Sequence, residues 1–100
     1  MTPHRRQALE RVKQIVLTAL AGQDATIYLF GSSVAGLVRH SSDIDIAIEP
    51  RGPLSPRTLA DLREALEESA IPYDVELVDL SQAAPEFRAR VIREGVPWRD

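Results

Sequence analysis

A strictly alternating run near the middle of the chain constrains its fold more than any other feature. Residues 43–49 read Asp-Ile-Asp-Ile-Ala-Ile-Glu, and Pro50 follows. Because successive side chains of a β-strand point to opposite faces, the run predicts a strand with Ile44, Ile46 and Ile48 on one face. The other face then carries Asp43, Asp45, Ala47 and Glu49. The isoleucine face has to be covered, so this strand must belong to a sheet on which other elements pack.

The remaining sequence predicts helices and two further strands. Apolar residues recur at helical spacing in three segments, residues 3–21, 56–70 and 85–94. Residues 25–30 are rich in β-branched and aromatic side chains, and apolar residues alternate over 73–79, so both segments are expected to be strands. A short helix is expected over 32–38. This order of elements favours the α/β (α+β) class with one sheet, and the apolar residues 96–98 are expected to pack on the sheet or to contact a partner.

Length and composition exclude several classes of function. One hundred residues suffice for one domain, so we expect a single domain over residues 1–100 and no separate substrate domain. The net charge is −3 and the 12 lysine and arginine residues are scattered, which argues against direct binding of nucleic acid. The chain has no cysteine, no apolar run of membrane-spanning length and no signal-peptide pattern, so we expect a cytoplasmic protein that does not associate with membranes.

A Gly-Ser pair precedes the alternating run, and together they suggest a site for a magnesium-bound nucleotide. Gly31 and Ser32 follow the strand expected at 25–30, where a glycine permits a positive φ or a close ligand and where free amides can hold a phosphate oxygen. Asp43 and Asp45 share a strand face about 6 to 7 Å apart, so their oxygens can converge on one or two magnesium or manganese ions. Without such a ligand, the same residues would form an ordinary strand-ending turn and a solvated polar face.

A third carboxylate is expected from another strand. Asp74, Glu76 and Asp79 all lie in or beside the strand expected at 73–79. Glu76 is the most central, whereas Asp74 is equally consistent with an exposed edge residue and Asp79 with a strand-end loop residue. The residues alone leave this assignment open.

The motifs resemble those of a known family. The pattern GSx10DxD in Gly31, Ser32, Asp43 and Asp45, the strand TIYLF and the later segment IPYDVELVDLSQAAPEFRARVI are similar to the minimal nucleotidyltransferases of the DNA polymerase β superfamily. The resemblance covers nearly the whole chain. It implies a polymerase β-like fold, with a small mixed sheet of three or more strands packed with helices. It also implies that Glu76 is the third acid, where the family has aspartate and other members of the superfamily have glutamate.

The resemblance implies a reaction and a partner. AMP is transferred from ATP to a hydroxyl, Asp43, Asp45 and Glu76 hold two magnesium ions, and Gly31 and Ser32 position the leaving phosphates. Proteins of this kind resemble antitoxins that silence a HEPN-domain ribonuclease toxin by attaching AMP to a tyrosine. The oligomeric state stays open, a homo-oligomer included.

The sequence also departs from the family, which keeps other functions open. Basic residues often follow the Gly-Ser pair in the family, but Ser33 and Ala35 stand at those positions here. Arg39 is a candidate replacement cation, although Arg39 and His40 equally fit ordinary surface positions, and Gly36 matches the second glycine of the family. A non-catalytic antitoxin that neutralises its toxin by contact is the alternative. Adenylylation of a small molecule such as an aminoglycoside would need a further domain.

Overall fold

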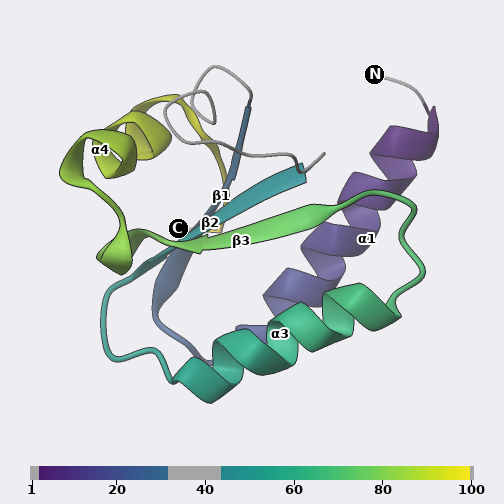
Figure 1. Ribbon diagram of the computed structural model, residues 1–100, viewed down its shortest axis with the longest axis horizontal. Coiled ribbons are helices and arrows are strands. Elements are labelled where there is room, and N and C mark those ends of the chain that lie inside the picture. The colour runs from purple at the N-terminus through teal and green to yellow at the C-terminus, as the bar shows by residue number, and fades with distance from the viewer. Residues whose placement is uncertain (1–2, 32–43, 100) are drawn as a thin grey trace.

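The computed structural model describes residues 3–31 and 44–99, except for the side chains of Pro3, Arg5 and Arg99. These ranges contain, in chain order, the following elements (Figure 1): α1 (Pro3–Ala19), β1 (Ala25–Phe30), β2 (Ile44–Pro50), α3 (Pro56–Glu68), β3 (Val75–Asp79), the 3-10 helix η1 (Leu80–Gln82), α4 (Pro85–Glu94) and β4 (Val96–Arg99). The short helix expected over 32–38 lies outside the described residues.

The strands form one mixed sheet in the order β3-β2-β1-β4. β1 is antiparallel to both β2 and β4, while β2 and β3 run parallel. The predicted fold class and mixed sheet are confirmed. Two details differ: β3 begins at Val75 rather than residue 73, and residues 96–99 form a strand that the sequence did not predict.

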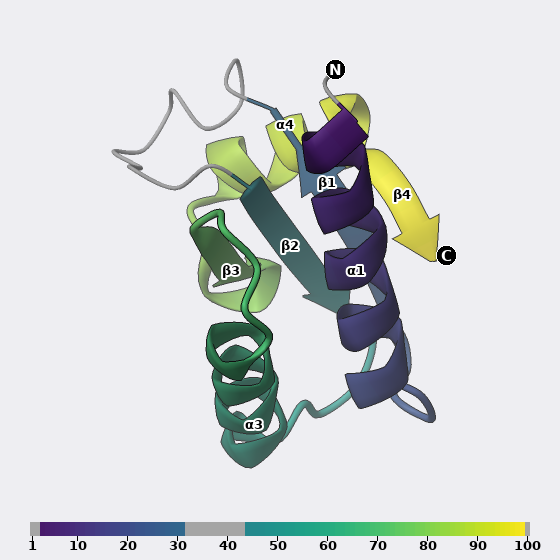
Figure 2. The ribbon, with the colours of Figure 1, turned by 90° about the vertical axis from the view of Figure 1, so that its right-hand side faces the viewer.

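Helices cover both faces of the sheet. Figure 2 shows α1 and α3 on one side of the strands and α4 on the other. The isoleucines of β2 and Leu77 of β3 pack with α1 and α3 in the larger core cluster, whereas Ala47 packs in a second cluster under α4. Phe30 and Phe87 meet edge to face in this second cluster, with ring centroids 5.5 Å apart. β2 is therefore buried on both faces from Ile44 to Ile48, rather than on its isoleucine face alone.

Local sequence signals explain where the helices begin and which face they bury. Ser55 caps α3 by accepting a hydrogen bond from the Arg57 amide at 3.2 Å, and Pro56 occupies the first turn. The buried side chains of α3 recur three and four residues apart, as expected for one face of a helix: Leu59, Leu62 and Leu66. α1 buries Ala8, Val12 and Val16 at a spacing of four, and Leu20, directly after the helix, continues the series.

The backbone at the junction of α4 and β4 lies close to β1. Gly95 ends α4, and a Cβ atom on it would lie 2.6 Å from the Val91 carbonyl oxygen and 3.3 Å from the Tyr28 Cβ. The missing side chain lets the chain turn directly from α4 into β4, which pairs with β1 from Leu29 to Ile27. Trp98 of β4 packs against the larger core cluster. For Trp98, packing within the fold, one of the two alternatives expected for residues 96–98, is therefore confirmed.

Candidate active site

The pairing of β2 with β3 places two of the predicted site acids side by side. In the parallel register, Asp45 lies opposite Glu76. Neighbouring strands are about 4.8 Å apart, and directly opposite residues of a sheet point to the same face. Asp45 is buried, with 7% of its surface exposed, whereas Glu76 is exposed. Asp45 is therefore covered by the surrounding structure, whereas Glu76 lies at the rim of the site.

The end of β1 lies on the other side of Asp45. Phe30 pairs with Asp45, and Gly31 follows directly. The three strands thus present, in order across the sheet, the glycine that ends β1, the inner acid of β2 and the rim acid of β3. This row joins the two halves of the sequence motif to Glu76, which is distant in sequence.

Gly31 does not need its conformational freedom for the fold. It does not adopt a positive φ, which was one of the two alternative reasons expected for a glycine at this position. A Cβ atom on Gly31 would meet no atom of the described chain within 4 Å. Among the described residues the space around this position is open, which is compatible with the other expected reason for the glycine, close approach of a ligand to the backbone. Ser32 and Asp43 lie outside the described residues, as do Ser33, Ala35, Gly36, Arg39 and His40.

The chemistry of the acid pair suits a divalent cation. Carboxylate oxygens are the ligands that magnesium prefers, and two carboxylates directly opposite each other on a sheet repel unless a cation compensates. Over residues 3–31 and 44–99, no three histidine or acidic side chains lie close enough together to hold a metal ion. Asp45 and Glu76 fit two of the three expected positions, and the third, Asp43, falls outside those ranges.

The structure separates the other two candidate acids from this pair. Asp79 accepts hydrogen bonds from the Ser81 amide at 2.9 Å and the Ser81 hydroxyl at 2.7 Å, and so caps η1. It pairs with Ile48, about 10 Å along the strands from Asp45 at ~3.3 Å per residue, and faces the opposite side from Glu76. Asp74 precedes β3 and is exposed, and its carbonyl accepts a hydrogen bond from the Ile44 amide at 3.0 Å. Of the three acids, Glu76 is the one in register with Asp45.

A further acid on the same face of β2 is already engaged by α4. Arg88 donates from Nε to both carboxylate oxygens of Glu49, at 3.2 and 3.0 Å, and a second guanidinium nitrogen contacts the same carboxylate. This hydrogen bonding and the charge of Glu49 raise the pKa of Arg88 above its ordinary value. Glu49 therefore anchors α4 beyond the site. Sequence reasoning missed this pair, since no local pattern links residues 39 positions apart.

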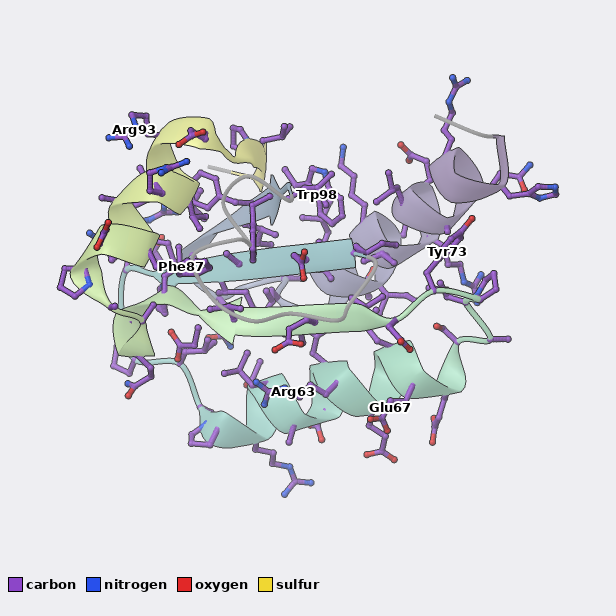
Figure 3. The ribbon with its side chains drawn as sticks, turned by 45° about the horizontal axis from the view of Figure 1, so that its top comes forward. Arg63, Glu67, Tyr73, Phe87, Arg93 and Trp98 are labelled. Atoms are coloured by element: carbon purple, nitrogen blue, oxygen red, sulfur yellow. The ribbon has the colours of Figure 1, made fainter. Side chains whose placement is uncertain are left out.

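An open groove adjoins the rim acid. It has a volume of about 590 Å³ and runs between α3 and β3. Figure 3 shows Arg63 and Glu67 on α3 and Tyr73 beyond the end of that helix. The groove is lined by Arg63, Leu66, Glu67, Ile71, Tyr73, Asp74, Val75, Glu76 and Leu77. No pattern in the sequence predicts this groove, because it arises from the packing of α3 against β3.

These features coincide with a match to a known family. The family described as "Polymerase beta, Nucleotidyltransferase" matches residues 17–97, and the chain belongs to this family. The matched span contains the Gly-Ser pair, both aspartates and Glu76. The resemblance noted in the sequence is therefore confirmed.

Individual relatives place the chain more closely within the family. It is 38% identical over 71 residues to the probable protein adenylyltransferase MntA of Haemophilus influenzae, covering 71% of this chain and 61% of that protein. The chain thus spans about three fifths of the length of this curated relative.

No helix in the described ranges combines the length and the apolar character needed to span a membrane.

Two solved structures share the fold. One is a toxin–antitoxin complex with AMP-PNP, with a TM-score of 0.59 and 31% identity over 87% of this chain and 72% of that chain. The other is a tri-AMPylated HEPN toxin of Shewanella oneidensis in complex with its MNT antitoxin, with a TM-score of 0.64 and 26% identity over 94% of this chain and 71% of that chain.

Proposed function

We propose that this protein is a magnesium-dependent adenylyltransferase that transfers AMP from ATP to a hydroxyl, in particular a tyrosine hydroxyl, of a partner HEPN toxin and thereby acts as its antitoxin. The observation that carries the proposal is the register of Asp45 with Glu76, one strand away from the open backbone at Gly31. The relatives named as an adenylyltransferase and as toxin–antitoxin complexes support the reaction and the partner. Consumption of ATP fits a cytoplasmic location.

Each residue of the proposed site has a role in this reaction that follows from its position. Asp43, Asp45 and Glu76 would hold magnesium, which when bound neutralises phosphate charge and polarises the phosphorus–oxygen bonds. The backbone at Gly31 and the Ser32 hydroxyl would bind the phosphates that leave. The acceptor oxygen attacks the α-phosphorus of ATP, and the bond between this phosphorus and the pyrophosphate oxygen breaks. Glu76 takes the proton of the acceptor hydroxyl. Its exposure at the rim suits Glu76 to meet an incoming acceptor.

The test is intact-protein mass spectrometry of the HEPN-domain partner after incubation with this protein, magnesium and ATP. We expect the partner to gain one or more AMP groups on tyrosine. An ATP analogue with a methylene bridge between the α- and β-phosphorus should block the gain, whereas a β,γ-imido analogue should support it, because the bond that breaks lies between the α- and β-phosphates. A partner that stays unmodified with ATP would contradict the proposal.

The non-catalytic antitoxin is the second candidate. Ser33 and Ala35, in place of the family's basic residues, favour it because they leave the triphosphate with fewer cationic contacts. Changing both Asp43→Asn and Asp45→Asn separates the two functions. Loss of toxin neutralisation in the double variant supports AMP transfer, and intact neutralisation establishes inhibition by contact.

A further inference from the structure

Asp45 lies at the end of the apolar cluster that α4 covers. On its own strand the next residue on the same face is Ala47, which is fully buried in that cluster. On β1 the residue opposite Asp45 is Phe30, which belongs to the same cluster. Apolar side chains therefore adjoin the carboxylate along β2 and across to β1, whereas Glu76 of β3 adjoins it on a third side.

The apolar cluster restricts the direction in which the Asp45 carboxylate can turn. Side chains directly opposite each other on a sheet have Cβ atoms about 4.5 to 5.5 Å apart, so the Phe30 ring lies beside Asp45. The five buried side chains of the cluster carry no hydrogen-bond donor, and a carboxylate turned toward them would lose hydration without compensation. The cluster therefore directs the carboxylate away from α4 and toward the end of the sheet where Gly31 and Glu76 lie.

Phe87 of α4 packs against the Phe30 ring and limits its movement. The two rings meet edge to face, with centroids 5.5 Å apart and planes at 84°, an arrangement that aromatic pairs prefer. Both residues are buried, and Figure 3 shows Phe87 where α4 lies over the sheet. The next residue, Arg88, binds Glu49 near the other end of β2. Two consecutive residues thus fix α4 over the face of the sheet that carries Asp45.

We infer that Phe87 is a positioning residue for Asp45: it holds Phe30, and Phe30 keeps the Asp45 carboxylate turned toward Glu76. The inference rests on the proposed function, which assigns Asp45 and Glu76 to the metal. Phe87 is buried on α4 and acts only through Phe30. Groups that support a metal ligand from behind are worth about 10- to 100-fold in metal affinity. A change at Phe87 should therefore weaken metal binding as well as lower stability.

Manganese binding tests the inference without any requirement for catalysis. Manganese shares the oxygen ligands of magnesium, and the electron paramagnetic resonance signal of the free ion measures its binding to the full chain. Phe87→Leu should weaken manganese affinity roughly tenfold. Val16→Ala is the matched control, because Val16 is fully buried in the larger cluster on the opposite face of the sheet. Both variants should lower Tm, and equal manganese affinities in the two would overturn the inference.

A milder variant separates the role of the ring from a loss of folding. Phe87→Met nearly conserves the side-chain volume, so this variant should remain folded, as circular dichroism at the temperature of the titration verifies. It should still bind manganese more weakly than Val16→Ala, because methionine does not reproduce the edge-to-face contact with Phe30. Affinity equal to that of the original protein would overturn the role of the ring.

A double-mutant cycle tests whether Phe87 acts through Phe30. Phe30→Leu should weaken manganese affinity at least as much as Phe87→Leu. The double variant should lose no more affinity than Phe30→Leu alone, since the ring through which Phe87 acts is already absent. Losses that multiply in the double variant would overturn this route.

Steady-state kinetics distinguish positioning of the metal ligand from recognition of the acceptor. With the HEPN partner as acceptor, Phe87→Leu should lower kcat and leave the KM for the partner unchanged. A raised KM with unchanged kcat would overturn the inference. If the original protein binds manganese but transfers no AMP, the proposed function fails, while the manganese affinities of Phe87→Leu and Val16→Ala still decide whether Phe87 positions Asp45.

Discussion

Gly95→Ala tests the contact on which the joint between α4 and β4 depends. The added Cβ would lie 2.6 Å from the Val91 carbonyl oxygen, so the atoms must separate by about 0.4 Å to reach even 3.0 Å. The same oxygen accepts the Gly95 amide at 2.7 Å, so this movement also weakens a hydrogen bond. Gly95 has φ −71, a value open to any residue, so the cost is steric rather than conformational.

The magnitude follows from these opposing effects. Overpacking costs about 1 to 3 kcal/mol, and the lower entropy of the unfolded alanine chain returns about 0.4 to 1 kcal/mol. We expect a net loss of about 1 to 2 kcal/mol in the free energy of unfolding, which lowers Tm by roughly 5 to 15 °C in a domain of this size. Urea unfolding measures it, with Trp98 fluorescence reporting on β4 and circular dichroism on the helices.

Gly52→Ala provides the matched control. A Cβ on Gly52 meets no described atom within 4 Å, and Gly52 does not have a positive φ. This variant should be as stable as the original protein or slightly more stable. If Gly95→Ala is as stable as Gly52→Ala, the close contact at Gly95 does not limit the side chain at the junction of α4 and β4.

Further predictions concern the site itself. Gly31→Ala should leave the free energy of unfolding within about 0.5 kcal/mol of its original value, because the added Cβ meets no described atom within 4 Å. It should weaken ATP binding about tenfold by calorimetry, because the Cβ would obstruct the approach of phosphate to the backbone; unchanged ATP affinity would contradict this role of Gly31. Asp79→Ala should cost up to about 1 kcal/mol of stability through loss of the η1 cap and leave AMP transfer unchanged, and a large loss of transfer would place Asp79 in the site. Magnesium at about ten times its Kd should raise Tm by several degrees, and the increase should disappear in Asp45→Asn. An equal increase in that variant would place the metal elsewhere.

The sequence predicted those parts of the fold that local patterns encode. Alternation was sufficient for β2, and the spacing of apolar residues was sufficient for α1, α3 and α4. β4 escaped prediction because Val96–Arg99 is short and contains a proline, which an edge strand tolerates but which no strand pattern suggests. Burial of Ala47 was also missed, since a small residue between two acids gives no sign that α4 covers it.

The candidate site also combines features that local sequence patterns encode with features that depend on long-range packing. The Gly-Ser pair and the two aspartates could be recognised as a motif, but the residues alone did not choose among Asp74, Glu76 and Asp79. That choice depends on the register of β2 with β3, which long-range packing sets. Ser81 beside Asp79 was visible in the sequence, yet its hydrogen bonds to that carboxylate became evident only in the fold.

In the proposed function, Asp45 and Glu76 form the centre for AMP transfer. The most direct measurement is the time course of AMP incorporation from labelled ATP into the HEPN partner, with Asp45→Asn and Glu76→Gln compared against the original protein. Complex formation with the partner should be equal for all three, whereas each variant should transfer AMP at least about 100-fold more slowly, as expected for loss of a group that acts in the transition state. Transfer at the original rate by Glu76→Gln would show that Glu76 has no part in AMP transfer.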